Sequence, residues 1–332
     1  MTLAGSLTLA LATGLASFGL SAIGLRILAD RAILDAPNAR SSHLRPTPRG
    51  GGLAVMAALL AAFAVAAWAI GELGRLAPLL MGAVLIAGVS FLDDVKALGA
   101  GVRLVAQSVA VVVGLLALPE GLVGQGLVPA WLDRALTAVG WLWFVNLFNF
   151  MDGIDGITAV ETIAIGAGVA LVAQLGGQPG LLPALGLAAA AAAIGFLPWN
   201  WHRAKVFLGD VGSVPLGYCL GFLLLSLAAH GFWAAALVLP LYYLLDATWT
   251  LLKRLIRREK VWQAHREHWY QHAAAATRHD SVSLRIAAAN LALVAVAAGT
   301  VLVSPGLLLL AGPVALLLVL ELKRMARAER RP

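Results

Sequence analysis

Asparagine and aspartate recur every three residues in the stretch NLFNFMDGIDG, which covers residues 146–156. If this stretch begins as a helix, Asn146, Asn149 and Asp152 share one slowly drifting stripe, because residues three apart are neighbours on a helix. Asp155 follows one step further along the chain. Carboxylates without partners are costly near hydrocarbon, and apolar segments flank this stretch on both sides. We therefore interpret it as part of a functional site.

Three more aspartates lie in two other polar segments. Asp93 and Asp94 are adjacent in FLDDVKALGAGVR, and Asp210 stands in FLGDVGS. Adjacent carboxylates raise each other's pKa unless a cation lies between them. Hard oxygen ligands favour Mg²⁺ or Mn²⁺, ions that usually serve phosphate substrates, and a single cysteine excludes a cysteine metal cluster. The alternative is structural: Asp93 caps a helix, and Asp210 closes a turn through its own side chain.

Two basic segments have the opposite character. The first, DAPNARSSHLRPTPRGGG, contains Arg45 and Arg49 and ends in glycines 50–52, whose amides at a helix N-terminus would suit an anion. The second contains His265, Arg266 and His268, and helical spacing of the two histidines would direct both at one diphosphate. An acidic, metal-binding centre between two basic segments suits a nucleotide diphosphate that meets a lipid phosphate.

The composition requires a membrane. Of 332 residues, 61% are hydrophobic and 12% are charged, and apolar runs recur at the length of roughly 20 residues that crosses a bilayer as a helix. We predict an all-α polytopic bundle of about eleven transmembrane helices (ten or eleven), forming a single membrane domain over residues 1–332. The predicted spans are 5–28, 51–71, 77–92, 103–119, 134–150, 158–175, 180–198, 213–230, 232–254, 284–303 and 306–322.

The basic residues orient this bundle. Of the 24 lysines and arginines, only Arg75 and Arg134 fall outside if the N-terminus is outside, which is a strong positive-inside asymmetry. The net charge of +7 therefore reflects topology and does not indicate nucleic acid. The C-terminus, with a basic tail at 323–332, is then cytoplasmic. The cytoplasmic loops that would form the site are 29–50, 93–102, 151–157, 199–212 and 255–283.

These motifs, in this order and on one membrane face, resemble those of the polyprenyl-phosphate N-acetylhexosamine-1-phosphate transferases. The resemblance covers Asp35 to about His272 and rests on PNARSSHLRPTPRGGG, FLDD, NFMDGIDG, FLGDVGS and the histidine loop. It implies Mg²⁺-dependent (or Mn²⁺-dependent) transfer of a sugar 1-phosphate from a UDP-sugar to undecaprenyl phosphate in the bacterial inner membrane, releasing UMP. The implied partners are these two substrates and the bilayer, with a homodimer left open and no nucleic acid.

The resemblance also implies roles for individual residues. Asp210 and Asn149 would hold the metal ion, and Asp155 would lie at the uridine. His265, Arg266 and His268 would hold the diphosphate. Asp93 and Asp94 would act on the lipid phosphate as base, positioning group or nucleophile, and we favour direct attack by the phosphate oxyanion itself. With Asp152 as a further catalytic residue, the remaining substrate-binding candidates are Asn146, Arg45 and Arg49.

The last loop departs from the family pattern. It reads HREHWYQH, where the muramoyl-pentapeptide enzymes carry three consecutive histidines. This departure argues against that substrate and favours the branch that initiates O-antigen-type and other envelope glycans on N-acetylated sugars.

Two other classes of protein were weighed. An ion-coupled transporter would use Asp93, Asp94 and Asp246, but transporters place charges near the membrane midplane. Only Asp246 lies clearly within a predicted span, where a cationic neighbour such as Lys253 would pair with it. A CDP-alcohol phosphotransferase needs a longer ladder of aspartates on consecutive helical turns, and the sequence does not contain one.

Overall fold

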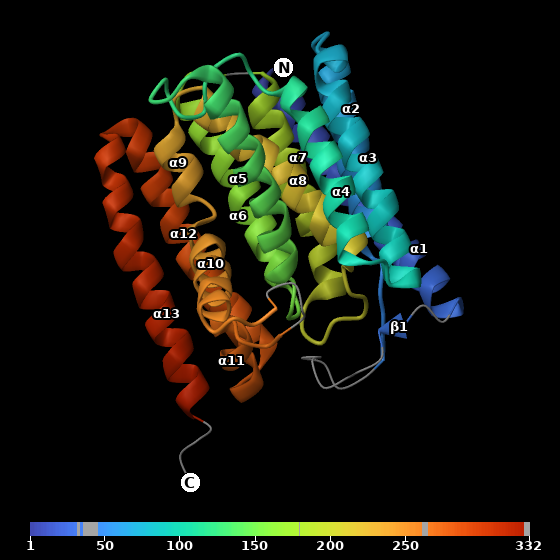
Figure 1. Cartoon of the computed structure of the whole chain (residues 1–332). Coiled ribbons are helices and arrows are strands. Elements are labelled where there is room, and N and C mark those ends of the chain that lie inside the picture. The colour runs from blue at the N-terminus through green and yellow to red at the C-terminus, as the bar shows by residue number, and fades with distance from the viewer. Residues whose placement is uncertain (32–33, 36–45, 179, 261–264, 329–332) are drawn as a thin grey trace.

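The computed structural model describes residues 1–31, 34–35, 46–178, 180–260 and 265–328. The fold is a bundle of long helices (Figure 1). The long helices are α1 (Leu3–Asp30), α2 (Gly52–Ala69), α3 (Leu73–Lys96), α4 (Ala100–Gly114), α5 (Ala130–Phe150), α6 (Ile157–Leu175), α7 (Leu181–Asn200), α8 (Asp210–Ala229), α10 (Leu241–Ile256), α12 (His279–Leu302) and α13 (Ala311–Ala328). Short elements are the helices α9 (Trp233–Val238) and α11 (Trp269–Ala276), the 3₁₀ turns η1 (Leu115–Ala117) and η2 (Pro305–Leu310), and the strands β1 (Leu34–Asp35) and β2 (Thr47–Pro48), which pair antiparallel.

The all-α polytopic fold predicted from the sequence is confirmed. Each of the eleven predicted spans is helical, and in the described part of the chain nine helical segments are long and apolar enough to cross a membrane. Helix α5, with 21 residues, falls outside these nine, and so do α9 and α10. The number of crossings therefore remains a prediction.

The ninth predicted span is not one continuous helix. Helix α9 ends at Val238 and α10 begins at Leu241, with Pro240 between them. Proline has no backbone N–H and clashes with the preceding turn, so it interrupts a helix at this point. Hydropathy alone does not reveal such a break, because both pieces are apolar.

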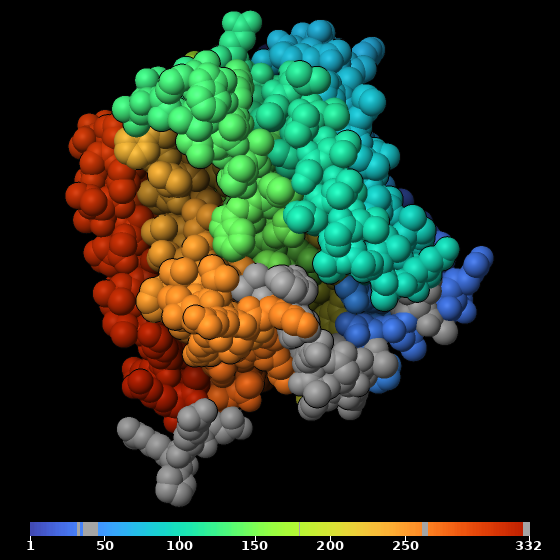
Figure 2. All heavy atoms as spheres, viewed as in Figure 1, coloured from blue at the N-terminus to red at the C-terminus, as the bar shows by residue number. Residues whose placement is uncertain are grey.

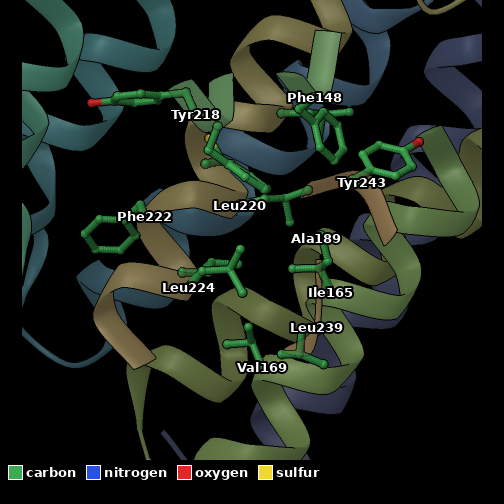
Figure 3. Close-up of a cluster of buried hydrophobic side chains, with 14 of the residues drawn as sticks. Phe148, Ile165, Val169, Ala189, Tyr218, Leu220, Phe222, Leu224, Leu239 and Tyr243 are labelled. Carbon is green, nitrogen blue, oxygen red and sulfur yellow. The ribbon is translucent and has the colours of Figure 1, made fainter. Parts of the chain in front are cut away.

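Helix α8 lies at the centre of the bundle. Of its 18-residue apolar window, 94% is buried, against 22–33% for α1, α3, α4 and α12. Tyr218 of α8 stacks on Trp141 of α5 with ring centroids 4.8 Å apart, and its hydroxyl donates to the Ala110 carbonyl oxygen of α4 at 3.0 Å. Figure 3 shows the surrounding core, to which α5, α6 and α7 contribute Phe148, Ile165 and Ala189, and the break between α9 and α10 contributes Leu239. The position of α8 fixes where its N-terminal residue, Asp210, must lie.

One end of the bundle collects the polar segments, and we call it the polar end. Helices α1, α3, α5, α7 and α10 finish there, and α2, α4, α6, α8 and α12 begin there (lower part of Figure 1). The N-terminus lies at the opposite end, and α13 returns the chain to the polar end. The connections that meet there are the ones that carry the motifs.

Candidate active site

The adjacent carboxylates of Asp93 and Asp94 point to different partners. Asp93 accepts a hydrogen bond from the Leu98 amide at 2.6 Å, at the end of its own helix, and pairs with Arg103 Nη1 at 3.0 Å. Asp94 accepts from the amides of Asp210 and Val211 at 3.2 and 3.0 Å, and therefore caps the N-terminus of α8. The structural alternative assigned the cap to Asp93, whereas the carboxylate that caps a helix N-terminus is Asp94, and it caps α8 rather than its own helix.

Asp210 lies between two arginines from different helix starts. Arg49, just before α2, places Nη2 2.7 Å from Asp210 Oδ1 and 2.8 Å from Asp94 Oδ1. Arg103, in the first turn of α4, places Nη1 3.6 Å from Asp210 Oδ2. The three aspartates therefore form one charge cluster, as the sequence predicted, with Arg49 inside it.

The glycine run before α2 holds this cluster together. The amides of Gly50 and Gly51 donate to the Phe207 carbonyl oxygen at 3.2 and 2.9 Å, and Gly52 donates to Leu208 at 2.8 Å. A Cβ on Gly52 would lie 2.2 Å from Gly212 Cα, so only glycine permits this approach. The expectation that these amides are available to an anion is wrong, because each is used to clamp the FLGD loop.

Asn149 and Asp152 lie where α5 gives way to the loop before α6. Asn149 Oδ1 accepts from the Ser213 hydroxyl at 2.6 Å, which ties the loop to the first turn of α8. Asp152 Oδ1 accepts from Thr158 at 2.6 Å. Burial, together with the negative charge of Asp210, raises the pKa of Asp152 to about 6 although Thr158 opposes the shift. Asp152 is thus an electrostatic neighbour of Asp210.

Asp155 is directed toward two histidines. Its Oδ2 lies 2.8 Å from His202 Nδ1 and 3.3 Å from His279 Nδ1, and it also accepts from the Ala204 amide at 3.3 Å. Burial acts to raise the pKa of Asp155, but the hydrogen bond and charge of His279 and the hydrogen bond of His202 outweigh it, and the net pKa is lowered. These contacts join the NFMDGIDG loop to α12 and to the connection between α7 and α8.

A groove leads from the charge cluster into the apolar flank of the bundle. It has a volume of about 140 Å³ and lies between α3, α4, α5 and α8. Its polar wall includes Arg103, Asn146, Asn149 and Asp210, and its apolar wall includes Ile86, Val89, Leu104 and Ala106. Asn146 donates to Gln107 Oε1 at 2.8 Å across the groove. Figure 2 shows the molecular surface hollowed between α5 and α4 toward the polar end.

The histidine loop differs from the prediction. Residues 265–267 precede α11 and are not helical, so helical spacing does not bring His265 and His268 to one ligand. His268 is buried as the N-cap of α11, with Nδ1 3.2 Å from Asp246 Oδ1. His265 stacks on His268 with ring centroids 4.9 Å apart, and burial together with the charges of His268 and Arg254 lowers the pKa of His265 to about 4. Arg266 is half-buried.

Asp246 does not pair with Lys253. It accepts hydrogen bonds from the Tyr242 hydroxyl at 2.9 Å and from the Trp269 amide at 3.1 Å, in addition to its contact with His268. A second intramembrane carboxylate also exists, because Glu161 of α6 is fully buried and accepts from Asn290 at 2.7 Å. The expectation that only Asp246 lies within a span is therefore wrong. Of the other predicted residues, Arg45 lies outside the described part of the chain.

This arrangement can be compared with proteins already known. A model of glycosyl transferase family 4 matches residues 76–228, which begin in α3 and end one residue before the end of α8. The matched region contains Asp93, Asp94, Asn149, Asp152 and Asp210. Residues 76–228 are thus similar to glycosyl transferase family 4.

Several known proteins are similar to this chain over stretches of 93 to 245 residues. A probable undecaprenyl-phosphate N-acetylglucosaminyl 1-phosphate transferase of Bacillus subtilis is 29% identical over 245 residues, which cover 71% of this chain and 68% of that protein. A decaprenyl-phosphate N-acetylglucosaminephosphotransferase of Mycobacterium tuberculosis is 34% identical over 219 residues, or 59% of this chain and 54% of that protein. A phospho-N-acetylmuramoyl-pentapeptide-transferase of Moorella thermoacetica is 38% identical, but over 93 residues only. The chain thus spans about half the length of the mycobacterial relative.

Several residues of this site were not singled out from the sequence. Arg103, Ser213 and Thr158 each hold a predicted aspartate or asparagine, and His202 and His279 hold Asp155. A signal existed for Arg103 and Ser213, which stand in the polar motifs themselves. His279 lies 124 residues from Asp155, and no spacing rule connects the two.

Proposed function

We propose that the protein transfers an N-acetylhexosamine 1-phosphate from a UDP-sugar to a polyprenyl phosphate such as undecaprenyl phosphate. One observation carries the proposal: a cluster of carboxylates and arginines stands at the mouth of an apolar groove, at one end of a membrane bundle. A lipid phosphate needs an apolar path for its chain and cationic groups for its phosphate, and the groove wall offers both.

A divalent cation fits the charge balance of the cluster. Asp93, Asp94 and Asp210 form ion pairs with Arg49 and Arg103, and Asp152 adds a fourth carboxylate beside Asp210, so that four carboxylates face two positive charges. The surplus is two negative charges when all four carboxylates are ionised. Oxygen donors of this kind suit Mg²⁺ or Mn²⁺, so we infer that Asp210 and Asn149 hold such an ion. When bound, it would neutralise charge on the diphosphate of the sugar nucleotide.

The chain's own residues then align the two phosphates. An oxygen of the lipid phosphate forms a bond to the phosphorus that carries the sugar, while the bond from that phosphorus to the bridging oxygen breaks and UMP leaves. The phosphate oxyanion is itself the nucleophile, so the step requires no covalent enzyme intermediate. Arg103, which lines the groove, holds the lipid phosphate, and Asp93 orients Arg103 through their ion pair. Alignment and charge neutralisation dominate such a transfer.

The relatives favour N-acetylglucosamine as the sugar. The proteins named for N-acetylglucosamine transfer match 55–71% of this chain, whereas those named for the muramoyl pentapeptide match 28–35% of it. The histidine loop, with its separated histidines, points the same way. The reaction would be the first membrane step of O-antigen or another envelope glycan, with the polar end on the cytoplasmic side of the bacterial inner membrane.

Release of UMP tests this proposal. Purified protein is incubated with undecaprenyl phosphate, Mg²⁺ and each of several UDP-sugars, and UMP is quantified. We expect release with UDP-N-acetylglucosamine that is lost when the lipid or the metal is withheld. The Asp280→Asn variant is the matched control, because Asp280 pairs with the exposed Arg278 and lies outside the cluster. If no UDP-N-acetylhexosamine releases UMP, the proposal that the protein is this transferase is rejected.

An ion-coupled transporter remains the alternative from another class. Its intramembrane carboxylates would be Asp246 and Glu161, but Asp246 already accepts several hydrogen bonds that fix α11 against α10. This use as a structural anchor disfavours a mobile ion path through Asp246. Uptake of a labelled solute into proteoliposomes, without UMP release, would favour the transporter.

A further inference from the structure

A second polar cavity lies on the side of the histidine loop that faces α13. It has a volume of about 460 Å³ and is formed where the end of α10, α11 and the end of α13 meet. We call it the basic pocket, and its polar lining consists of Lys253, Glu267, Trp269, His272, Lys323 and Arg327. In Figure 2 this region lies at the lower left, where α13 (red) meets the orange helices. None of its residues lines the groove beside Asp210.

Among the residues that the structure describes, three cations of the basic pocket have no carboxylate partner. Lys253, Lys323 and Arg327 form no ion pair among the residues that the structure describes. Among the described residues that line the pocket, the one acidic residue is Glu267, which pairs with Arg254 and Arg257, and neither arginine lines the pocket. The pocket therefore presents a surplus of positive charge. Lys323 Nζ lies 5.3 Å above the ring of Trp269, at cation–π distance, which holds this charge beside the cavity.

Apolar surface leads directly into the pocket from the membrane side. On α13, Leu316 and Leu320 are 58% and 53% exposed, and they precede Lys323 and Arg327 at intervals of three and four residues. All four share one face of the helix, because such intervals return to the same side. On α10, Trp249 is 50% exposed and stands one turn before Lys253. On each of the two helices, exposed apolar side chains therefore lead along the helix to a cation at the pocket.

We propose that the basic pocket binds the phosphate headgroup of an anionic membrane phospholipid, with the acyl chains lying along the exposed faces of α13 and α10. Basic pockets at the membrane surface attract such headgroups, and tryptophan favours the same interface. The apolar stripe decides for a lipid over a soluble phosphate, because a soluble phosphate gains nothing from Leu316 and Leu320. Trp269 is the first residue of α11 and follows His268, so the bound headgroup would brace the histidine loop from behind.

Native mass spectrometry of the full-length protein tests this proposal without any turnover. The delipidated protein is titrated with phosphatidylglycerol or with phosphatidylcholine, and the apparent Kd of the first adduct is measured. We expect preference for phosphatidylglycerol, and a loss of about 25-fold in affinity in Lys323→Gln/Arg327→Gln, since each basic residue near the surface contributes about fivefold. Lys253→Gln, on a different helix, should weaken binding about fivefold.

The matched control removes the same charge elsewhere. Arg278 and Arg324 have side chains that are 70% and 85% exposed and lie outside the pocket. Arg278→Gln/Arg324→Gln should bind phosphatidylglycerol as the wild type does, and equal weakening would overturn the proposal in favour of diffuse attraction. Full displacement of the lipid by millimolar glycerol 3-phosphate would overturn it in favour of a soluble ligand. Because binding is read directly, failure of the proposed transfer reaction would leave this result intact.

Discussion

The carboxylate of Asp210 is contacted by two arginines from different directions. Arg49 and Arg103 approach it from two helix starts, while its backbone amide is held by Asp94. The side chain is thus fixed at the mouth of the groove, where we infer a metal ion. A neutral amide of the same shape keeps the packing and removes the charge, which separates the electrostatic role from the structural one.

We predict that Asp210→Asn lowers the rate of UMP release at least 100-fold, because electrostatic groups of this kind contribute several kcal/mol to a phosphoryl transfer. The concentration of Mg²⁺ needed for half-maximal residual activity should rise. Both quantities come from a titration of Mg²⁺ in the UMP assay, with thermal unfolding as the test of folding. Near-normal activity in a folded variant would remove Asp210 from the inferred metal site.

His265 should remain neutral throughout the physiological range. Its pKa is lowered to about 4 by burial and by nearby positive charge, so the imidazolium form appears only as the pH falls below that value. We predict that its ring ¹⁵N signals in the substrate-free protein do not titrate between pH 5 and 8, with His265→Gln used for assignment. A titration midpoint near 6.5 would show that the ring is not held in this environment. A neutral His265 would contact a diphosphate by hydrogen bonding rather than by charge.

The sequence predicts which residues lie close together, but not which of their atoms already have a hydrogen-bond partner within the protein. Asp93, Asp94, Asn149, Asp152 and Asp210 were predicted to converge, because they share polar segments between apolar spans, and the structure brings them together. The amides of glycines 50–52 were expected to be free, yet all three are used. A hydrogen-bond partner far along the chain, such as Phe207 for Gly51, leaves no local trace in the sequence.

At the scale of elements, the contact between α2 and α8 is set by two glycines. Gly52 and Gly212 bring the backbones so close that a Cβ on Gly52 would lie 2.4 Å from the Gly212 nitrogen. The two atoms nearest to this Cβ, the Cα and the nitrogen of Gly212, belong to the backbone, which cannot move aside as a flexible side chain would. This contact places Arg49, three residues before Gly52, against Asp210.

We predict that Gly52→Ala lowers the free energy of unfolding by about 1–3 kcal/mol, the usual cost of forcing extra volume into a packed contact. Activity should fall as well, because α2 must shift and Arg49 shifts with it. The matched control is Gly88→Ala in α3, where a Cβ meets nothing within 4 Å. Detergent-titrated unfolding measures stability, and UMP release measures activity. Equal stability of the two variants would contradict the close approach.

Helix positions were predicted well and helix details poorly, for a physical reason. Hydropathy reports where a segment is apolar, and each predicted span except the ninth therefore coincides with one continuous helical segment. It does not report the break at Pro240 or the short helix α11, since both depend on local backbone chemistry. The N-cap role of His268 also depends on Asp246, 22 residues away, which holds the start of α11.

At the scale of the whole molecule, the sequence gives no direct sign of which helix is central. Helix α8 is no more apolar than its neighbours, with a mean hydropathy of 1.8 against 2.2 for α2. Its burial follows instead from small residues that admit close neighbours, such as Gly217 against Phe148 and Gly221 against Trp141. A central α8 carries Asp210 into the middle of the polar end, where segments from several other helices can reach it.

The number of crossings can be decided by three engineered cysteines. Cys219 is buried and is the single natural cysteine, so Cys219→Ser gives a background for Leu127→Cys, Lys205→Cys and Arg278→Cys, each at an exposed position. If α5 crosses the membrane, three helices separate residues 127 and 205, which then lie on opposite sides. If α9 and α10 together cross, residues 205 and 278 lie on the same side.

In spheroplasts, a membrane-impermeant maleimide should therefore label only Leu127→Cys, and lysis should expose the other two cysteines. Labelling of both 127 and 205 before lysis would show that α5 does not span, and labelling of 278 without 205 would show the same for α9 and α10.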